Sequence, residues 1–255
     1  MELWTPQHAQ TLLPALVIMI VAAIILRLTI GKKNLKIRMI PFQIFAVIIV
    51  LLEIGKQVMS FQNGYDLYHI PLHFCSLFIF ALPVMAFYRG KHQQTVFEVV
   101  TVLCTAMTVL MLIYPNLIYA PGNIENYFKG YFDFHTVTFH NIVMFQLILI
   151  LALDLNEGQC KPAVKPLTIV TLIFCVISAS LAQILQTNYA NFYSCNVGPI
   201  EEFRIAMQGV LGYVLTQIIY VTVLSALNVG FVLLSCAIYR LIKKLLPSKQ
   251  PVAIK

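Results

Sequence analysis

A short stretch of an otherwise apolar sequence carries several side chains that can act as nucleophiles, bases or ligands. Residues 68–76 read Tyr-His-Ile-Pro-Leu-His-Phe-Cys-Ser, so His69, His73 and Cys75 lie close together along the chain. Ionisable and nucleophilic side chains are costly at membrane depth, and their presence in an apolar run points to function. A cysteine thiol needs a base that generates the thiolate before it can attack an acyl ester.

The base for Cys75 is not expected within the same stretch. Pro71 predicts a helix start, because proline fits the first helical turn, where its missing N–H would have had no partner. On a straight helix that begins there, His69 and His73 share a face, whereas Cys75 points about 200° away from His73. Cys75 therefore cannot use His73 as its base without distortion of the helix.

A second histidine-bearing stretch supplies a better base. Residues 132–141 contain His135 and His140, and His140 lies deeper in the apolar run that follows. A pair formed by Cys75 and His140, with Asn or Gln side chains as oxyanion donors, would suit acyl transfer. The side chains expected to orient the substrate or stabilise the oxyanion are His73, Asn141 and Asn188.

Further polar side chains are predicted at the same depth and are candidates for a substrate pocket. Glu53 and Lys56 lie three residues apart on one helix face, where they can also simply neutralise each other. His69 and His73 have HxxxH spacing, which would alternatively allow a metal site. No HExxH motif and no carboxylate ligand accompanies these histidines, so no metal is expected. No other cofactor is expected either. The substrate-binding candidates are Glu53, Lys56, His69, Asn116, His135, Asn141 and Asn188.

Cys75 also has two readings that involve no catalysis. A buried cysteine commonly behaves as a small, inert hydrophobic residue. A disulfide with Cys195 is the other reading, because Cys195 is predicted to lie in a loop on the same side of the membrane. The six cysteines show no CxxC spacing, which argues against a disulfide framework and against a zinc site.

The composition defines an integral membrane protein. Hydrophobic residues make up 60% of the 255 residues and charged residues 11%, with a mean hydropathy of +0.84, whereas soluble domains carry roughly 25% charge. The net charge is +7, but the basic residues are spread over short loops and the C-terminal tail without an interleaved aromatic patch. Nucleic acid is therefore not an expected partner.

Seven apolar runs are long enough to cross about 30 Å of hydrocarbon. We therefore expect an all-α, polytopic protein with one seven-helix domain over residues 1–245 and a short basic cytoplasmic tail over residues 246–255. The runs are Leu12 to Ile30, Pro41 to Phe61, Ile70 to Tyr88, Val96 to Tyr114, Val137 to Leu153, Pro166 to Gln186, and Met207 to about Ile242. The last is too long for one upright span, which predicts a tilt, a bend near Asn228 to Gly230, or a protruding helix.

The charges predict the orientation of these runs. The first ten residues contain no Lys or Arg, unlike the start of a cleavable signal peptide, so the first run is expected to remain as an anchor. Basic residues concentrate in the loops after the odd-numbered runs and in the tail, which places the N-terminus outside and the C-terminus in the cytoplasm. The candidate residues above then gather at the outer ends of the helices, and the cytoplasmic halves show no comparable cluster.

Four features of the sequence resemble the YwaF family of bacterial membrane proteins, which is grouped with eukaryotic transmembrane protein 164. They are residues 68–76, the Tyr-Pro-Asn-Leu of residues 114–117, the histidine-bearing start of the fifth run, and Asn188-Tyr189 followed by Gly198-Pro199. The resemblance extends from about the second run to the start of the seventh.

The resemblance implies an activity. The eukaryotic relatives are regarded as phospholipid acyltransferases with a cysteine near this motif and a downstream histidine, which implies His73, Cys75 and His140 here. In the eukaryotic branch the cysteine directly precedes the motif histidine, a position that Leu72 occupies in this chain. In this motif, His73 is therefore the residue of this chain that matches the eukaryotic branch.

The leading hypothesis is a multi-pass protein of the bacterial cytoplasmic membrane, with a polar pocket that opens to the extracytoplasmic side. In it, Cys75 attacks an acyl ester of a membrane lipid after His140 has removed the thiol proton. Alternatively, the pocket binds or moves a small polar solute or a lipid head group without covalent chemistry. Inverted repeats or helices broken near the midplane would favour a transporter, and the sequence predicts neither. A third reading is an accessory subunit of a larger complex.

Overall fold

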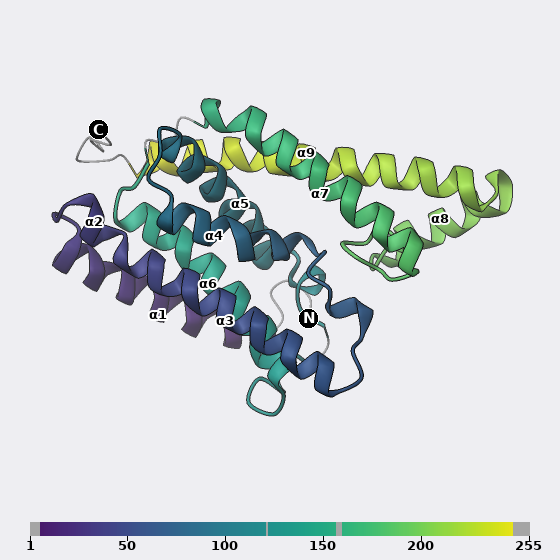
Figure 1. The fold of residues 1–255 in the computed structure, drawn as a ribbon, viewed down its shortest axis with the longest axis horizontal. Coiled ribbons are helices and arrows are strands. Elements are labelled where there is room, and N and C mark those ends of the chain that lie inside the picture. The colour runs from purple at the N-terminus through teal and green to yellow at the C-terminus, as the bar shows by residue number, and fades with distance from the viewer. Residues whose placement is uncertain (1–5, 121, 157–159, 247–255) are drawn as a thin grey trace.

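The computed structural model describes residues 6–120, 122–156 and 160–246, and the regular structure in this part of the chain is helical (Figure 1). The prediction of an all-α protein is confirmed for these residues. The longer helices are α1 (Pro6–Ile30), α3 (Ile40–Gln62), α5 (Gln93–Ile113), α6 (Tyr131–Ala152), α7 (Val164–Leu185) and α9 (Tyr213–Leu245). The shorter helices are α2 (Leu35–Arg38), α4 (Leu77–Phe87) and α8 (Gly198–Leu211), with 3-10 turns η1 (Leu67–His69), η2 (Phe74–Ser76), η3 (Pro115–Leu117) and η4 (Lys161–Ala163).

Six described helices, rather than the seven expected, are long and apolar enough to cross a membrane. They correspond to the predicted runs except the third, which supplies only a shorter apolar helix over Phe74–Phe87. A helix needs about 20 residues to cross the hydrocarbon core. The chain is therefore a multi-pass helical membrane protein with six full-length candidate spans.

The third apolar run does not begin a helix at Pro71, so that prediction is wrong. Ile70 has an extended conformation (ψ 133°), as does His73 (ψ 154°), and the α-helix begins only at Leu77. Ile70 precedes a proline, which disfavours the helical region for it. Between Ile70 and His73, the Leu72 N–H donates to the Ile70 carbonyl at 2.7 Å, so residues 70–73 form a non-helical turn. The helical face that would have joined His69 to His73 therefore does not exist.

Side chains from neighbouring segments satisfy the carbonyl groups that this break leaves without helical partners. Gln57 Nε2 donates to the His69 carbonyl at 2.8 Å, and Ser178 Oγ of α7 donates to the Leu72 carbonyl at 3.0 Å. Tyr189 Oη donates to the Leu67 carbonyl at 2.6 Å. Non-helical backbone at membrane depth is tolerated where protein groups satisfy it. The break is thus held by contacts with α3, α7 and the loop after α7.

The break lies at one end of α3, and α4 runs back along α3 toward its other end. Gln43 Nε2, in the first turn of α3, lies 3.4 Å from the carbonyl oxygen of Ala86 near the end of α4. Together the extended residues and α4 therefore cover most of the length of α3. We call the end of the bundle with His69, His73, His135 and His140 the histidine end, and the opposite end, where α2 lies, the α2 end (Figure 1).

The last apolar run is divided into α8 and α9 at Gly212. Gly212 has φ +76° and ψ 166°, a conformation that favours glycine. α8 packs along α9, and the two meet at the end of the molecule farthest from α2 (Figure 1). α9 continues without interruption through Asn228 to Gly230, so the predicted bend there is wrong.

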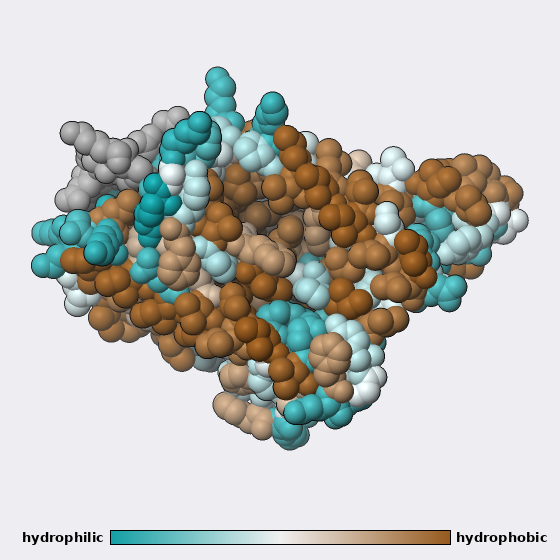
Figure 2. Space-filling view, in the orientation of Figure 1, coloured by the Kyte–Doolittle hydropathy of each residue, from teal (hydrophilic) through white to brown (hydrophobic). Residues whose placement is uncertain are grey.

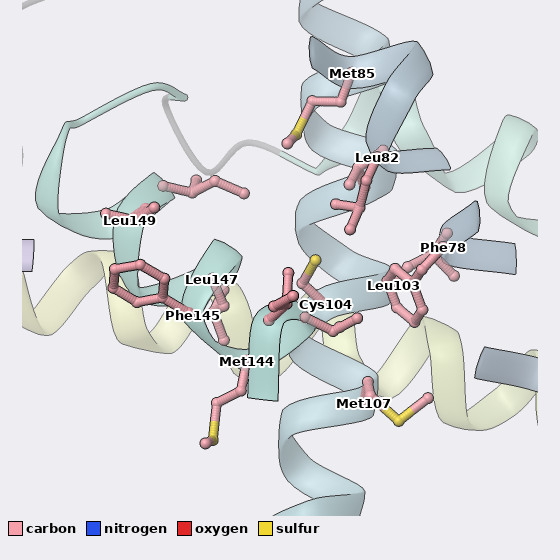
Figure 3. Close-up of a cluster of buried hydrophobic side chains, with 14 of the residues drawn as sticks. Phe78, Leu82, Met85, Leu103, Cys104, Met107, Met144, Phe145, Leu147 and Leu149 are labelled. Carbon is pink, nitrogen blue, oxygen red and sulfur yellow. The ribbon is translucent and has the colours of Figure 1, made fainter. Parts of the chain in front are cut away.

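The main hydrophobic core lies where α4, α5 and α6 pack together (Figure 3). Phe78, Leu82 and Met85 of α4 lie near Leu103 and Met107 of α5 in this cluster. α6 adds apolar side chains from the facing side. A second, smaller cluster around Phe174 and Tyr189 packs α7 against residues 70–77. The broken segment is therefore held between two apolar cores.

The surface has the pattern expected of a membrane protein. On the face in Figure 2, hydrophilic residues gather around α2 and near the far end of α3, and hydrophobic residues cover most of the surface between them. Of the long described helices, α1 has the smallest buried share, 11% of its span, and is therefore the most exposed to lipid. The basic loop of Lys32, Lys33, Lys36 and Arg38 belongs to the α2 end.

Candidate functional site

Glu53 is the centre of a polar network at the histidine end. Its side chain lies between α3 and α6 and is 7% exposed. Oε1 accepts a hydrogen bond from Gln57 Nε2 at 2.7 Å and forms an ion pair with Lys56 Nζ at 2.8 Å. Oε2 lies 3.3 Å from Nε2 of His135 on α6. The pairing of Glu53 with Lys56 is confirmed, and the network joins it to His135.

The contact between His135 and Glu53 is electrostatic rather than a well-aligned hydrogen bond. The His135 Nε2 atom is buried, and none of the hydrogen bonds of the described residues ends on it. α6 approaches α3 closely at this level, because Tyr131 Oη donates to the Leu52 carbonyl at 2.9 Å. A side chain at Gly55 would collide with Tyr131, since a Cβ there would lie 2.0 Å from Oη. Gly55 thus permits the approach that brings His135 to Glu53.

His69 is held by α3 and α6 together. Ser60 Oγ lies 2.7 Å from its Nδ1 atom, and the ring of Phe132 stacks on the imidazole at 4.4 Å between centroids. Desolvation lowers the pKa of His69, opposed by the carboxylate of Asp66. Ser60 was not among the predicted site residues. It shares a helix face with Glu53 and Gln57, and this helical spacing could have identified it.

His73 is fixed in one tautomer by the backbone. Its Nε2 atom lies 3.2 Å from the Tyr68 carbonyl, which can only accept, so Nε2 carries the proton and Nδ1 is the acceptor. The ring packs against Tyr68 at 4.5 Å and against Tyr189 at 5.9 Å between centroids.

His140 is fixed in the opposite tautomer. Its Nδ1 atom lies 2.7 Å from the Thr136 carbonyl in the preceding turn of α6, so Nδ1 donates the proton and Nε2 keeps its lone pair. The side chain is buried, with the ring edge-on to Tyr119 at 5.8 Å. A neutral imidazole with a free Nε2 lone pair can accept a proton from a nearby thiol or hydroxyl group.

Cys75 lies in η2, at the start of the segment that leads into α4. It is half-buried, whereas four of the other cysteines are buried. Among the described residues, no hydrogen bond joins Cys75 to an imidazole. Cys75 and Cys195 are both free, so the disulfide considered from the sequence is not formed.

The three predicted asparagines have different positions. Asn141 follows His140 on α6 and is half-buried. Asn188 lies in the loop after α7 and organises it, because its Oδ1 accepts from the N–H groups of Tyr193 and Ser194. Asn116 lies in η3, and its side chain is outside the described part of the structure. Asn141 is thus next to His140 along α6, whereas the hydrogen bonds of Asn188 are made within its own loop.

The histidines do not form a cluster of metal ligands in the described part of the chain. No group of three or more His, Cys, Asp or Glu side chains there could hold a metal ion.

The α2 end contains a second buried polar cluster, contrary to the sequence-based expectation. Asn156 Nδ2 donates to Thr101 Oγ1 of α5 at 2.7 Å, and Tyr239 Oη of α9 donates to Asn156 Oδ1. Lys243 of α9 forms an ion pair with Asp154 at 2.9 Å. The sequence signal was weak because these residues come from separate helix ends and loops. The cluster ties α9 to α5 and to the turn after α6.

The fold and the site together define a class: a multi-pass helical membrane protein with buried polar clusters between its helices, one of them built around Glu53 and His135. The chain belongs to the TMEM164 family, whose model matches residues 3–229. This finding supports the part of the resemblance that concerned transmembrane protein 164. No curated protein and no solved structure matches the chain.

Proposed function

We propose that the protein transfers acyl groups of membrane lipids at the histidine end, with Cys75 as nucleophile and His140 as general base. The observation that carries this proposal is the tautomer of His140, whose Nε2 lone pair is left free by the hydrogen bond from Nδ1 to Thr136. Cys75, a half-buried thiol, belongs to the same end of the bundle. Family membership agrees with the proposal without specifying an activity.

The proposed reaction has two steps. His140 Nε2 takes the proton of the Cys75 thiol, and the thiolate attacks the carbonyl carbon of a lipid ester. The carbon–oxygen bond breaks, the leaving alcohol takes the proton from His140, and the acyl group remains as a thioester on Cys75. In the second step, the hydroxyl group of an acceptor lipid gives its proton to His140 and attacks the thioester, which regenerates the thiol. Asn141 is the proposed donor to the oxyanion. His73, whose Nδ1 atom is an acceptor, is proposed to orient the substrate.

The proposed reaction site faces the extracytoplasmic side of a bacterial cytoplasmic membrane. The support for this orientation is the concentration of Lys and Arg at the α2 end, which is the pattern of cytoplasmic loops. Membrane lipids would then reach the histidine end from the outer leaflet.

Labelling of purified protein tests the proposal. A lipid-like acyl phosphonate or a thiol-directed lipid probe is added to the protein in detergent, and the adduct is located by peptide mass spectrometry. We expect an adduct on Cys75 that is lost in Cys75→Ala and reduced by orders of magnitude in His140→Gln. Cys195→Ala is the matched control, because Cys195 is also free and half-buried. An adduct yield that is the same in Cys75→Ala and in wild type would refute the covalent mechanism.

A second candidate is binding or movement of a polar solute or lipid head group without covalent chemistry. Two observations favour it: no hydrogen bond joins Cys75 to an imidazole among the described residues, and the helical path is broken at residues 70–73. Broken membrane helices often surround the binding sites of transporters. Retained ligand binding in a Cys75→Ala variant that has lost all adduct formation separates the two candidates.

A further inference from the structure

We propose that the groove between α3 and α4 binds the acyl chain of a lipid whose ester group lies at the histidine end. This inference deepens the proposed function, on which it rests, by assigning a site for the part of the substrate that does not react. The groove has a volume of about 160 Å³ and is lined by Ala46, Val47, Val50, Leu51, Pro83 and Phe87.

The chemistry of the lining selects an apolar occupant. All six side chains are hydrocarbon, and the small residues Ala46 and Pro83 leave the space between the two helices unfilled. Val47 is 48% exposed, Leu51 59% and Phe87 53%, so the groove is open at the surface of the protein. This surface belongs to helices that cross or enter the membrane, where an alkyl chain is the available apolar partner.

The position of the groove connects it to the site. Leu51 lies at nearly the same level along α3 as Glu53, but on the exposed side of the helix, whereas Glu53 is buried. α4 begins directly after Cys75 and Ser76. Pro83 lies about 10 Å beyond Ser76 along the helix, at 1.5 Å per residue. An acyl chain extends about 15 Å from the ester region to the bilayer midplane, half the thickness of the hydrocarbon core. A chain attached to an ester near Cys75 is therefore long enough to reach the groove.

Photo-crosslinking tests this assignment and needs no catalysis. The full-length protein is placed in nanodiscs containing phosphatidylcholine with a diazirine near the end of one acyl chain, and the crosslinked peptides are identified by mass spectrometry. We expect crosslinks to concentrate on α3 and α4 relative to α1, although α1 is also exposed to lipid over most of its surface. Labelling that is equally dense on α1 would overturn the proposal.

Two substitutions that fill the groove sharpen the test. Val47→Phe and Leu51→Phe place a ring in the groove and are expected to reduce crosslinking to α4 several-fold. Ile44→Phe is the matched control, because Ile44 lies on the same helix, is 53% exposed and does not line the groove. All three positions are exposed to lipid, so the substitutions leave the core unchanged. Equal crosslinking in Val47→Phe and Ile44→Phe would contradict an acyl-chain site in the groove.

The Cys75→Ala variant separates this inference from the proposed function. It is expected to give the same crosslinks as wild type, since the groove does not include Cys75. An adduct on Cys75 together with uniform crosslinking would refute the groove and leave the acyl transfer standing. Crosslinks concentrated on α3 and α4 without any adduct on wild-type Cys75 would support a lipid-chain site and refute the acyl transfer.

Discussion

At the scale of single residues, backbone carbonyl groups set the state of the histidines. The Tyr68 carbonyl accepts from Nε2 of His73, and the Thr136 carbonyl accepts from Nδ1 of His140, so the two imidazoles present different nitrogen atoms as acceptors. The sequence predicts which histidines lie at this end of the bundle. It could not predict these tautomers, because the partner of His73 depends on a break in the chain that the periodicity does not show.

The hydrogen bond between His73 and the Tyr68 carbonyl predicts how two substitutions differ in stability. In His73→Gln, the amide can still donate to this carbonyl, whereas His73→Leu leaves the carbonyl without this donor. We expect the free energy of unfolding to be about 1–3 kcal/mol lower in His73→Leu than in His73→Gln.

Chemical unfolding of both variants in the same detergent measures this difference. His92→Leu is the control, because His92 is exposed at the start of α5. Equal stabilities of His73→Leu and His73→Gln would mean that the hydrogen bond to the Tyr68 carbonyl does not stabilise the fold.

At the scale of helices, the close approach of α3 and α6 controls the geometry of the site. Tyr131 of α6 reaches the Leu52 carbonyl only because position 55 has no side chain, and the same contact brings His135 to Glu53. Glycine in the interior of a helix is destabilising by itself, so its presence here has a packing reason.

The substitution Gly55→Ala is predicted to separate the two helices. The new Cβ would lie 2.0 Å from Tyr131 Oη, and the required shift should reduce the free energy of unfolding by about 1–3 kcal/mol. Gly230→Ala in α9 is the matched control. A Cβ at Gly230 meets nothing within 4 Å, so helix propensity alone should make that variant slightly more stable. Chemical unfolding in the same detergent measures the free energy of unfolding of both variants. Equal values for Gly55→Ala and Gly230→Ala would exclude the close contact between position 55 and Tyr131.

The helices also show what the sequence could predict and why the rest was missed. Long apolar runs identified six spans to within about six residues at each end, because the length of a run is set by membrane thickness. Pro71 was misread as a helix start, since the donors that stabilise the extended residues, such as Ser178 and Tyr189, come from distant segments. Gly212 likewise divides a continuous apolar run through its positive φ, which hydropathy does not detect.

At the scale of the whole molecule, the orientation inferred from the charges requires an odd number of crossings. The six long helices supply an even number, so the proposed orientation predicts that the broken segment of residues 70–87 acts as a seventh crossing. Gln43 and Ala86 support this reading, because their contact brings the end of α4 back to the first turn of α3.

Cysteine labelling in intact cells tests this topology. In a background with Cys75→Ala and Cys195→Ala, single cysteines are introduced by Lys33→Cys, Lys91→Cys and Glu125→Cys, all at exposed positions. We expect a membrane-impermeant maleimide to label Glu125→Cys only, with the two lysine positions labelled after permeabilisation. Labelling of Lys91→Cys in intact cells would mean that residues 70–87 do not cross the membrane.

The length of α9 has a mechanical consequence. Its 33 residues extend about 50 Å, and fitting that length into about 30 Å of hydrocarbon would require a tilt of roughly 50°, beyond the 0–40° seen for membrane helices. Val210 and Val214, on either side of Gly212, are 83% and 70% exposed, so the tip of the molecule where α8 meets α9 has an apolar surface. A thicker bilayer would cover more of this apolar tip with hydrocarbon, and a thinner bilayer would leave more of it in water. The tilt and depth of the molecule in the membrane should therefore depend on bilayer thickness.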